Sequence, residues 1–272
     1  MKLPALFYSR RRVTMAFSPF DPKVFQAALT TNAVGRFLEY RSIVDTTMVL
    51  ARRSASQGAP HGSIIVAEEQ TAGRGRQGRS FFSPPGENLY FTLVLRGRPA
   101  EFRVLPIAVP LAVALAIEST GLRCGIKWPN DIWIGGRKVS GILIDSEDSG
   151  GDFVALPGIG INVNTDFSEV PELKDTATSL RSELGHELIR EEMLAELCNS
   201  FEELLSAPRS QVISSYRERS VVLGFEVVVA RRSAEPFVAM AEDIEEDGAL
   251  SVRLNNGTLQ SLHTGDVSLR PT

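Results

Sequence analysis

Apolar residues along the first 220 positions form two kinds of pattern. Short apolar runs bounded by glycine, proline or asparagine predict buried strands. Longer stretches with apolar residues three or four positions apart predict helices. The two kinds are interleaved, which is typical of a mixed α/β domain. The predicted strands cover residues 37–44, 63–67, 88–96 and 153–163.

The predicted helices are marked by their ends as well as by their periodicity. Asp21 and Pro22 have the residue types of a helix N-cap and a first helical position, and they predict a short helix through Leu29. We interpret residues 101–120 as a core helix whose prolines break its first turn. Further helices are predicted for residues 45–55, 178–184 and 190–206.

The pattern changes after residue 224. Five short strands follow within 50 residues. Asp247-Gly248 and Asn256-Gly257 are turn signals, each of them between two consecutive strands. This spacing predicts a small antiparallel barrel. The strands are expected at residues 226–230, 237–242, 249–254, 259–263 and 267–270.

Residues 127–145 contain a predicted hairpin with chemically interesting side chains. A two-residue turn at Gly135-Gly136 would join the strands on either side of it. Side chains opposite one another in such a hairpin lie on the same face of the sheet. The turn predicts the pairs Ile134 with Arg137, Trp133 with Lys138, and Asp131 with Ser140, which places Asp131, Trp133, Lys138 and Ser140 on one face.

A glycine- and arginine-rich segment lies between two of the predicted strands, at residues 68–79. Its glycines allow the backbone to approach a ligand closely, and its guanidinium groups suit phosphate or carboxylate. Few core contacts are expected there, so we predict a loop that is mobile until an anion orders it. The residues concerned are Gly73, Gly75, Gly78, Arg74, Arg76 and Arg79.

Taken alone, this segment has three other interpretations. It could be a disordered nucleic-acid-binding segment, a solvated surface loop, or a basic patch without a specific ligand. The composition argues against a general nucleic-acid binder, because the formal net charge is −4. The second stretch, K-W-P-N-D-I-W-I-G-G-R-K-V-S-G-I-L-I-D at residues 127–145, favours a specific site.

Together the two stretches resemble the biotin protein ligase family. The family's catalytic domain carries a G-R-G-R-x-G-R loop, a K-W-P-N-D segment and an R-K-x-x-G-I-L segment in this order, and the similarity runs from about residue 45 onward. The resemblance implies an α/β (α+β) fold, with a mixed-sheet, class II synthetase-like catalytic domain and a small SH3-like carboxy-terminal barrel. The domains are then expected at residues 36–220 and 221–272, after an amino-terminal tail and short helix at residues 1–35.

The resemblance also implies a biotin site. Thr46 and Thr47 match positions that bind the ureido group, although Met48 stands where the family usually has asparagine. Their alternative role is helix capping alone. The aromatic ring of Phe81 would form a wall against biotin, or belong to the core. The full biotin-binding set is Thr46, Thr47, Gln70, Gly73, Arg74, Gly75, Arg76, Lys138, Gly141 and Gly158.

The implied nucleotide site overlaps with it. Lys138 matches the lysine that holds the carboxylate of biotin and the acyl phosphate of its adenylate, whereas an ordinary cross-strand ion pair with Asp131 is the alternative. The nucleotide-binding set is Arg74, Arg76, Arg79, Asn130, Asp131, Lys138 and Asn162, and the catalytic set is Lys138, Arg74, Arg76 and Asp131. No metal-ligand cluster or Ser/His/Asp arrangement is evident, so catalysis is expected to rest on positioning and electrostatics.

The composition also predicts the cellular compartment of the protein. The 272 residues are 43% hydrophobic and contain only Cys124 and Cys198, which suits a reducing cytoplasm and no disulfide framework. The longest apolar run, residues 105–117, is interrupted by prolines and shorter than roughly 18 residues, so no membrane span is expected. Residues 1–12 have the reverse charge order of a secretory signal. A flexible tail is the preferred interpretation, with Met15 as an alternative translation start, and a transit peptide is the other interpretation.

The resemblance predicts the reaction and its partners. Biotin and ATP, with Mg²⁺, would give biotinyl-5′-AMP, and a lysine of the biotin carboxyl carrier protein of acetyl-CoA carboxylase would accept the biotinyl group. Some 45 residues precede the similar region, too few for a winged helix-turn-helix of about 60 residues, so no repressor function or nucleic acid is expected. The alternatives are a lipoate or octanoate ligase or transferase and, in another class, a nucleic-acid-binding protein. A monomer and a homodimer both remain open.

Overall fold

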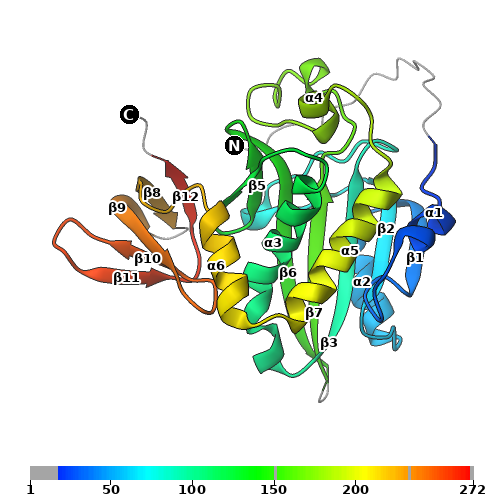
Figure 1. The fold of residues 1–272 in the computed structure, drawn as a ribbon, viewed down its shortest axis with the longest axis horizontal. Coiled ribbons are helices and arrows are strands. Elements are labelled where there is room, and N and C mark those ends of the chain that lie inside the picture. The colour runs from blue at the N-terminus through cyan, green and yellow to red at the C-terminus, as the bar shows by residue number, and fades with distance from the viewer. Residues whose placement is uncertain (1–17, 150–151, 232–233, 270–272) are drawn as a thin grey trace.

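A seven-stranded sheet forms the centre of the computed structural model, which describes residues 18–149, 152–231 and 234–269. The strand order is β1-β2-β3-β7-β6-β5-β4. β1 and β2 are parallel and every other neighbouring pair is antiparallel, so the predicted mixed sheet is confirmed (Figure 1). The strands are β1 Leu38–Val44, β2 Ser63–Gln70, β3 Leu89–Gly97, β4 Gly125–Lys127, β5 Asp131–Ile134, β6 Arg137–Ser149 and β7 Asp152–Ile161.

Helices cover both faces of this sheet. The long helices α3 and α5 pack on one face with α1 and α6, while α2 packs alone on the other face against β2, β3 and β7 (Figure 1). Asp21 caps α1 through the Lys23 amide, as predicted. The helices are α1 Pro22–Ala28, α2 Thr47–Ser56, α3 Leu105–Glu118, α4 Leu180–Leu184, α5 Arg190–Ser206 and α6 Arg209–Arg219.

Helix α3 is almost entirely buried in the core. Its residues are apolar on all sides, which is typical of a helix surrounded by protein or lipid. The segment Pro99–Glu118 is long and apolar enough to cross a membrane by composition, but α3 is enclosed by α5, α6 and the sheet. A 3-10 segment, Pro99–Val104, precedes α3, which agrees with the predicted broken first turn. The helix is therefore core scaffold.

The described residues before β1, from Ser18 onward, join the same core, whereas the predicted flexible tail and the start at Met15 lie outside the described residues. Phe20 and Phe25 are buried in it, and a buried ion pair fixes the chain at this point. The Arg190 guanidinium donates to Glu68 at 2.8 Å and to the Ser18 carbonyl at 3.0 Å. The division into domains at residues 35 and 220 stays a prediction, but the segment from Ser18 onward packs as part of the larger unit.

A five-stranded antiparallel sheet follows α6, with the order β11-β10-β9-β8-β12. The predicted turns at Gly248 and Gly257 are present, with φ values of 87° and 84° that favour glycine. The predicted change of period is therefore confirmed. The strands are β8 Glu226–Arg231, β9 Ala234–Ile244, β10 Leu250–Arg253, β11 Leu259–Leu262 and β12 Asp266–Leu269.

Both cysteines are free thiols in the described chain. Cys198 is buried in the core, and Cys124 is partly buried. Burial raises the pKa of the Cys124 thiol to about 12 and also raises the pKa of Cys198. Neither thiol is therefore activated as a nucleophile at neutral pH.

Candidate active site

A cavity of about 430 Å³ opens where the large sheet meets the carboxy-terminal sheet. Its walls come from five places: the start of α2, the glycine- and arginine-rich loop, the β4–β5–β6 segment, the middle of β7, and β12. Most of the predicted site residues line it. These are Thr46, Thr47, Gln70, Arg74, Gly75, Arg76, Arg79, Asn130, Asp131, Lys138, Gly141 and Gly158.

The β5–β6 hairpin differs from its predicted register at one position. The pairs Ile134–Arg137 and Trp133–Lys138 form as predicted, but Asp131 pairs with Gly141 instead of Ser140. A bulge at Val139 is the cause, because the extra residue shifts every later pair by one position. Ser140 therefore turns away from the Asp131 and Lys138 face, is fully buried opposite Ile132, and its hydroxyl has no hydrogen-bond partner among the described residues.

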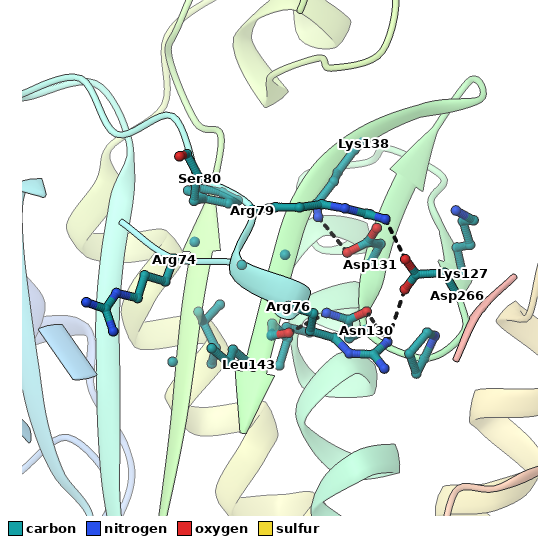
Figure 2. Close-up of a pocket in the computed structure, with 18 of the residues that line it drawn as sticks. Arg74, Arg76, Arg79, Ser80, Lys127, Asn130, Asp131, Lys138, Leu143 and Asp266 are labelled. Carbon is teal, nitrogen blue, oxygen red and sulfur yellow. Dashed lines mark hydrogen bonds and ion pairs between the residues drawn. The ribbon is translucent and has the colours of Figure 1, made fainter. Parts of the chain in front are cut away.

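Lys138 and Asp131 meet in the cavity despite this shift. The Lys138 Nζ lies 2.6 Å from Asp131 Oδ1, and both side chains keep some exposure to solvent (Figure 2). A second lysine lies close by, with Lys127 Nζ 4.5 Å from the centre of the Trp133 ring. Burial lowers the pKa of Lys127 below its usual range, although the nearby carboxylates of Asp131 and Asp266 oppose this shift. The cavity thus concentrates positive charge opposite few carboxylates.

The glycine- and arginine-rich loop is folded over the cavity and held by the carboxy-terminal sheet. Arg79 forms an ion pair with Asp266 at 2.6 Å, and Arg76 lies 3.7 Å from the same carboxylate and donates to the Gly265 carbonyl at 3.1 Å (Figure 2). Arg74 is exposed, and its guanidinium points away from Lys138. The mobility of the free loop stays a prediction. Sequence reasoning did not single out Asp266, which lines the cavity and pairs with both arginines, because no local motif surrounds it.

A chain of hydroxyl and amide groups connects Thr47 and Gln70, which line the cavity, to buried residues next to it. The Thr47 amide donates to Gln70 Oε1 at 2.9 Å, the Thr47 hydroxyl lies 3.3 Å from the same oxygen, and Gln70 Nε2 donates to Ser83 at 3.3 Å. Thr92, on β3 and fully buried, lies with its hydroxyl 2.9 Å from that of Thr47. Thr46 caps α2 by accepting from the Met48 amide, so capping and lining the cavity are combined at this residue.

Replacing Thr92 with valine tests this chain. Valine keeps the shape but removes the hydroxyl that fixes the Thr47 hydroxyl, so ligand affinity is expected to fall by about tenfold, the weight of one lost hydrogen bond. Thr31→Val, which removes a buried hydroxyl bonded to the Val34 carbonyl elsewhere, is the matched control. Titration calorimetry with biotin, the ligand that the sequence resemblance implies, measures both. An unchanged affinity in the Thr92 variant would rule out this role.

Two glycines of β7 leave room for side chains that line the cavity. A Cβ atom at Gly160 would come within 2.5 Å of the Phe81 ring, and one at Gly158 within 2.8 Å of Met48. Phe81 is partly exposed and lines the cavity, as expected of a wall against a ligand. Met48 is buried and also lines it, where an asparagine would have offered an amide. This wall is therefore apolar, and it borders the charged groups, since Lys138 Nζ lies 5.9 Å from the centre of the Phe81 ring.

Two predicted site residues lie outside the lining. Gly73 is buried at the base of the loop, where a Cβ would come within 2.8 Å of the Phe81 carbonyl and the Ser83 hydroxyl, so it allows the two ends of the loop to pack together. Asn162 is also buried, and its amide bonds to backbone carbonyls. Direct ligand contacts from these two residues stay predictions.

Within the described ranges there is no group of three or more His, Cys, Asp or Glu side chains that could hold a metal ion by itself. The described residues that line the cavity supply two carboxylates, those of Asp131 and Asp266. Mg²⁺ is commonly bound through one or two carboxylates together with substrate phosphates and water. The donor set fits a metal ion that arrives with a nucleotide better than a resident one.

Comparisons with known proteins agree with this geometry. The Biotin/lipoate A/B protein ligase family matches residues 40–164, and the Biotin protein ligase C terminal domain matches residues 222–270. A biotin protein ligase from Aquifex aeolicus, solved in complex with biotin and ATP, has 30% sequence identity and a TM-score of 0.70, and the match covers 87% of this chain and 100% of that one. Fold and site thus define a ligase of the biotin and lipoate class.

Two curated relatives make the assignment more specific. A biotin–[acetyl-CoA-carboxylase] ligase from Paracoccus denitrificans is 34% identical over 202 residues, covering 70% of this chain and 83% of the relative. The bifunctional ligase/repressor BirA of Bacillus subtilis strain 168 is 32% identical over 250 residues, covering 89% of this chain and 76% of the relative. The chain belongs to the biotin protein ligase family.

Proposed function

We propose that the protein is an ATP-dependent ligase that attaches biotin to the biotin carboxyl carrier protein of acetyl-CoA carboxylase. In the first step a carboxylate oxygen of biotin attacks the α-phosphorus of ATP, giving biotinyl-5′-AMP and releasing pyrophosphate. In the second step the amine of the acceptor lysine attacks the acyl carbon and AMP leaves. The cavity is the observation that carries the proposal. The ion pair of Lys138 and Asp131 and the arginine-rich loop meet there.

The distribution of charge explains how the first step could proceed. Biotin carboxylate and ATP phosphate are both anions, and their approach costs electrostatic energy that nearby cations offset. Lys138 on the hairpin, Arg76 on the loop and Lys127 on β4 all line the cavity. The fold brings these groups from separate elements to one cavity, which places them near the reacting anions.

Mg²⁺ would enter with the nucleotide under this proposal. The ion would neutralise part of the phosphate charge and polarise the phosphorus that is attacked. Asp131 and Asp266 are the carboxylates that could complete its coordination, and Lys138 would have to release Asp131 to allow this.

A lipoate or octanoate ligase is the alternative within this class. The carboxy-terminal match and the names of the relatives favour biotin. Biotin-dependent exchange of labelled pyrophosphate into ATP tests the proposal, with lipoate and octanoate as competing substrates. Transfer of biotin to a purified carrier domain tests the second step. Exchange that depends on lipoate but not on biotin would overturn the choice of substrate.

A cytoplasmic location is also proposed, supported by the two free cysteines. The absence of nucleic-acid binding and the oligomeric state stay predictions. A filter-binding assay at several salt concentrations tests the former, because electrostatic binding to nucleic acid weakens steeply as salt is raised.

Arg76→Gly is expected to separate synthesis of the adenylate from its retention. The variant loses the contacts of Arg76 with Gly265, Asn130 and Asp266, which hold the loop over the cavity. The adenylate, a reactive mixed anhydride, should then escape and acylate added albumin in proportion to amine concentration. Quantitative biotin blotting measures this labelling. Loss of synthesis, or labelling confined to the carrier, would show that Arg76 serves the chemistry or that the loop is not a lid.

A further inference from the structure

The turn between β9 and β10 of the carboxy-terminal sheet rests on the larger unit. The indole N–H of Trp128 donates to the Gly248 carbonyl in this turn at 2.9 Å. Trp128 belongs to the K-W-P-N-D segment, is 2% exposed and packs in the core. Gly248 has a φ of 87°, and a Cβ atom there would come within 2.8 Å of the Pro106 side chain. A glycine therefore allows the turn to approach the start of α3 this closely.

Two arginines of α6 hold the same turn. The Arg217 guanidinium donates to the Ile244 carbonyl at 2.7 Å, and that of Arg209 donates to the Glu246 carbonyl at 2.6 Å. Helix α6 lies beside the carboxy-terminal sheet, as Figure 1 shows. Three side-chain donors of the larger unit therefore end on backbone carbonyls of one short segment. We call this contact the turn seat, and it consists of residues 244–248 with Trp128, Pro106, Arg209 and Arg217.

The carboxy-terminal sheet touches the larger unit again at the start of β12. There Asp266 pairs with Arg76 and Arg79 of the loop over the cavity. Asp266 lies opposite Ala230, near the end of β8, and this end of β8 lies beside the beginning of β9. The turn seat follows the end of β9. The two contacts are therefore at opposite ends of β9, so holding the sheet at the seat also determines where Asp266 lies.

The two contacts differ in kind. The Trp128 bond is enclosed by the core, and the packing of Gly248 on Pro106 leaves no room for another side chain. At the other end the Arg79 side chain is 69% exposed, and ion pairs in contact with solvent hold their partners weakly. The ion pairs alone would therefore fix the sheet poorly, whereas the seat is built to fix it.

We propose that the turn seat positions the carboxy-terminal sheet so that Asp266 meets the arginine-rich loop over the cavity, with Trp128 as a positioning residue that acts through Gly248. Release of the seat should let the sheet move relative to the larger unit and take Asp266 away from the loop. The consequence for retention of the adenylate rests on the proposed function, but the placement of the sheet does not.

Gly248→Ala tests the seat, because the added methyl group collides with Pro106. Gly257→Ala is the matched control. Gly257 has a φ of 84° in the turn between β10 and β11, and an added Cβ atom there meets nothing within 4 Å. Both variants carry similar backbone strain, but only the first disturbs the seat. Trp128→Phe is a second test variant, which keeps an aromatic ring and removes the donor.

Spin labels measure the placement of the sheet directly. Cysteines introduced by Glu203→Cys on α5 and Glu235→Cys on β9 carry the labels, because both positions are exposed. Pulsed electron paramagnetic resonance should give one narrow distance distribution in the labelled parent and in Gly257→Ala. The distribution should be shifted or broadened in Gly248→Ala and Trp128→Phe. An unchanged distribution in both seat variants, or an equal change in Gly257→Ala, would overturn the inference.

The ratio of albumin labelling to carrier labelling measures the consequence for the site. This ratio should rise by about threefold or more in Gly248→Ala and in Asp266→Asn, because each change releases the loop. Combining the two changes should raise it no further, since the seat acts through Asp266. Full additivity would contradict this route. Wild-type protein that forms no adenylate would contradict the proposed function, while the label distances would still decide the inference about the seat.

Discussion

Replacing Lys138 with alanine is expected to abolish biotin-dependent pyrophosphate exchange, with a loss of about a thousandfold or more, while leaving the fold intact. The ammonium is the cation placed on the rigid hairpin beside Asp131, and a preorganised charge of this kind commonly contributes two to three orders of magnitude. The side chain is partly exposed, so its removal leaves no cavity in the core. The midpoint of thermal unfolding should match that of the wild type.

Two further variants show whether the position or merely the charge matters. Lys138→Arg keeps a positive charge but changes its geometry, and should remain strongly impaired because guanidinium and ammonium groups are not interchangeable at a positioned site. Lys174→Ala removes an exposed lysine from the loop that precedes α4 and should behave as the wild type. Exchange at a near wild-type rate in Lys138→Ala would refute its assignment.

Arg190→Met is expected to have the largest effect on stability. Arg190 and Glu68 are 6% and 5% exposed in their side chains, and the change leaves the Glu68 carboxylate buried without its counter-ion. Breaking a buried pair from one side typically costs about 3–5 kcal/mol. The Ser18 and Asn88 carbonyls would also lose a donor. Urea unfolding monitored by circular dichroism measures the change.

The matched control is the exposed pair of Arg253 and Glu242 on the carboxy-terminal sheet, whose N–O distance is 2.6 Å. Arg253→Met should leave the unfolding midpoint unchanged, because solvent screens this pair. Adding Glu68→Gln to Arg190→Met should recover part of the lost stability, since the uncompensated charge is removed. If Arg190→Met and Arg253→Met changed the unfolding midpoint equally, the buried pair of Arg190 and Glu68 would not have the special importance for stability that we infer.

Local patterns were sufficient for most of the secondary structure. Caps, glycine turns and apolar periodicity depend on neighbouring residues, so the sequence alone predicted α5 at Arg190–Ser206 and the turns at Gly248 and Gly257. Motif similarity gathered the residues of the hairpin and the loop into one site, and the structure brings Lys138, Asp131 and Arg76 to the same cavity. Their individual roles stay predictions until they are tested.

Three features depended on contacts between distant parts of the chain. The bulge at Val139 forms where the backbone of Asn162 meets β6, and a turn motif carries no information about that partner. Asp266 reaches Arg76 and Arg79 only because the second sheet packs beside the first. Thr92, a strand residue among apolar neighbours, contacts Thr47 only once β3 lies beneath α2. The sequence by itself determined the helices and strands and the side chains of the site. The packing of strands and domains decided which backbone atoms and carboxylates hold these side chains in place.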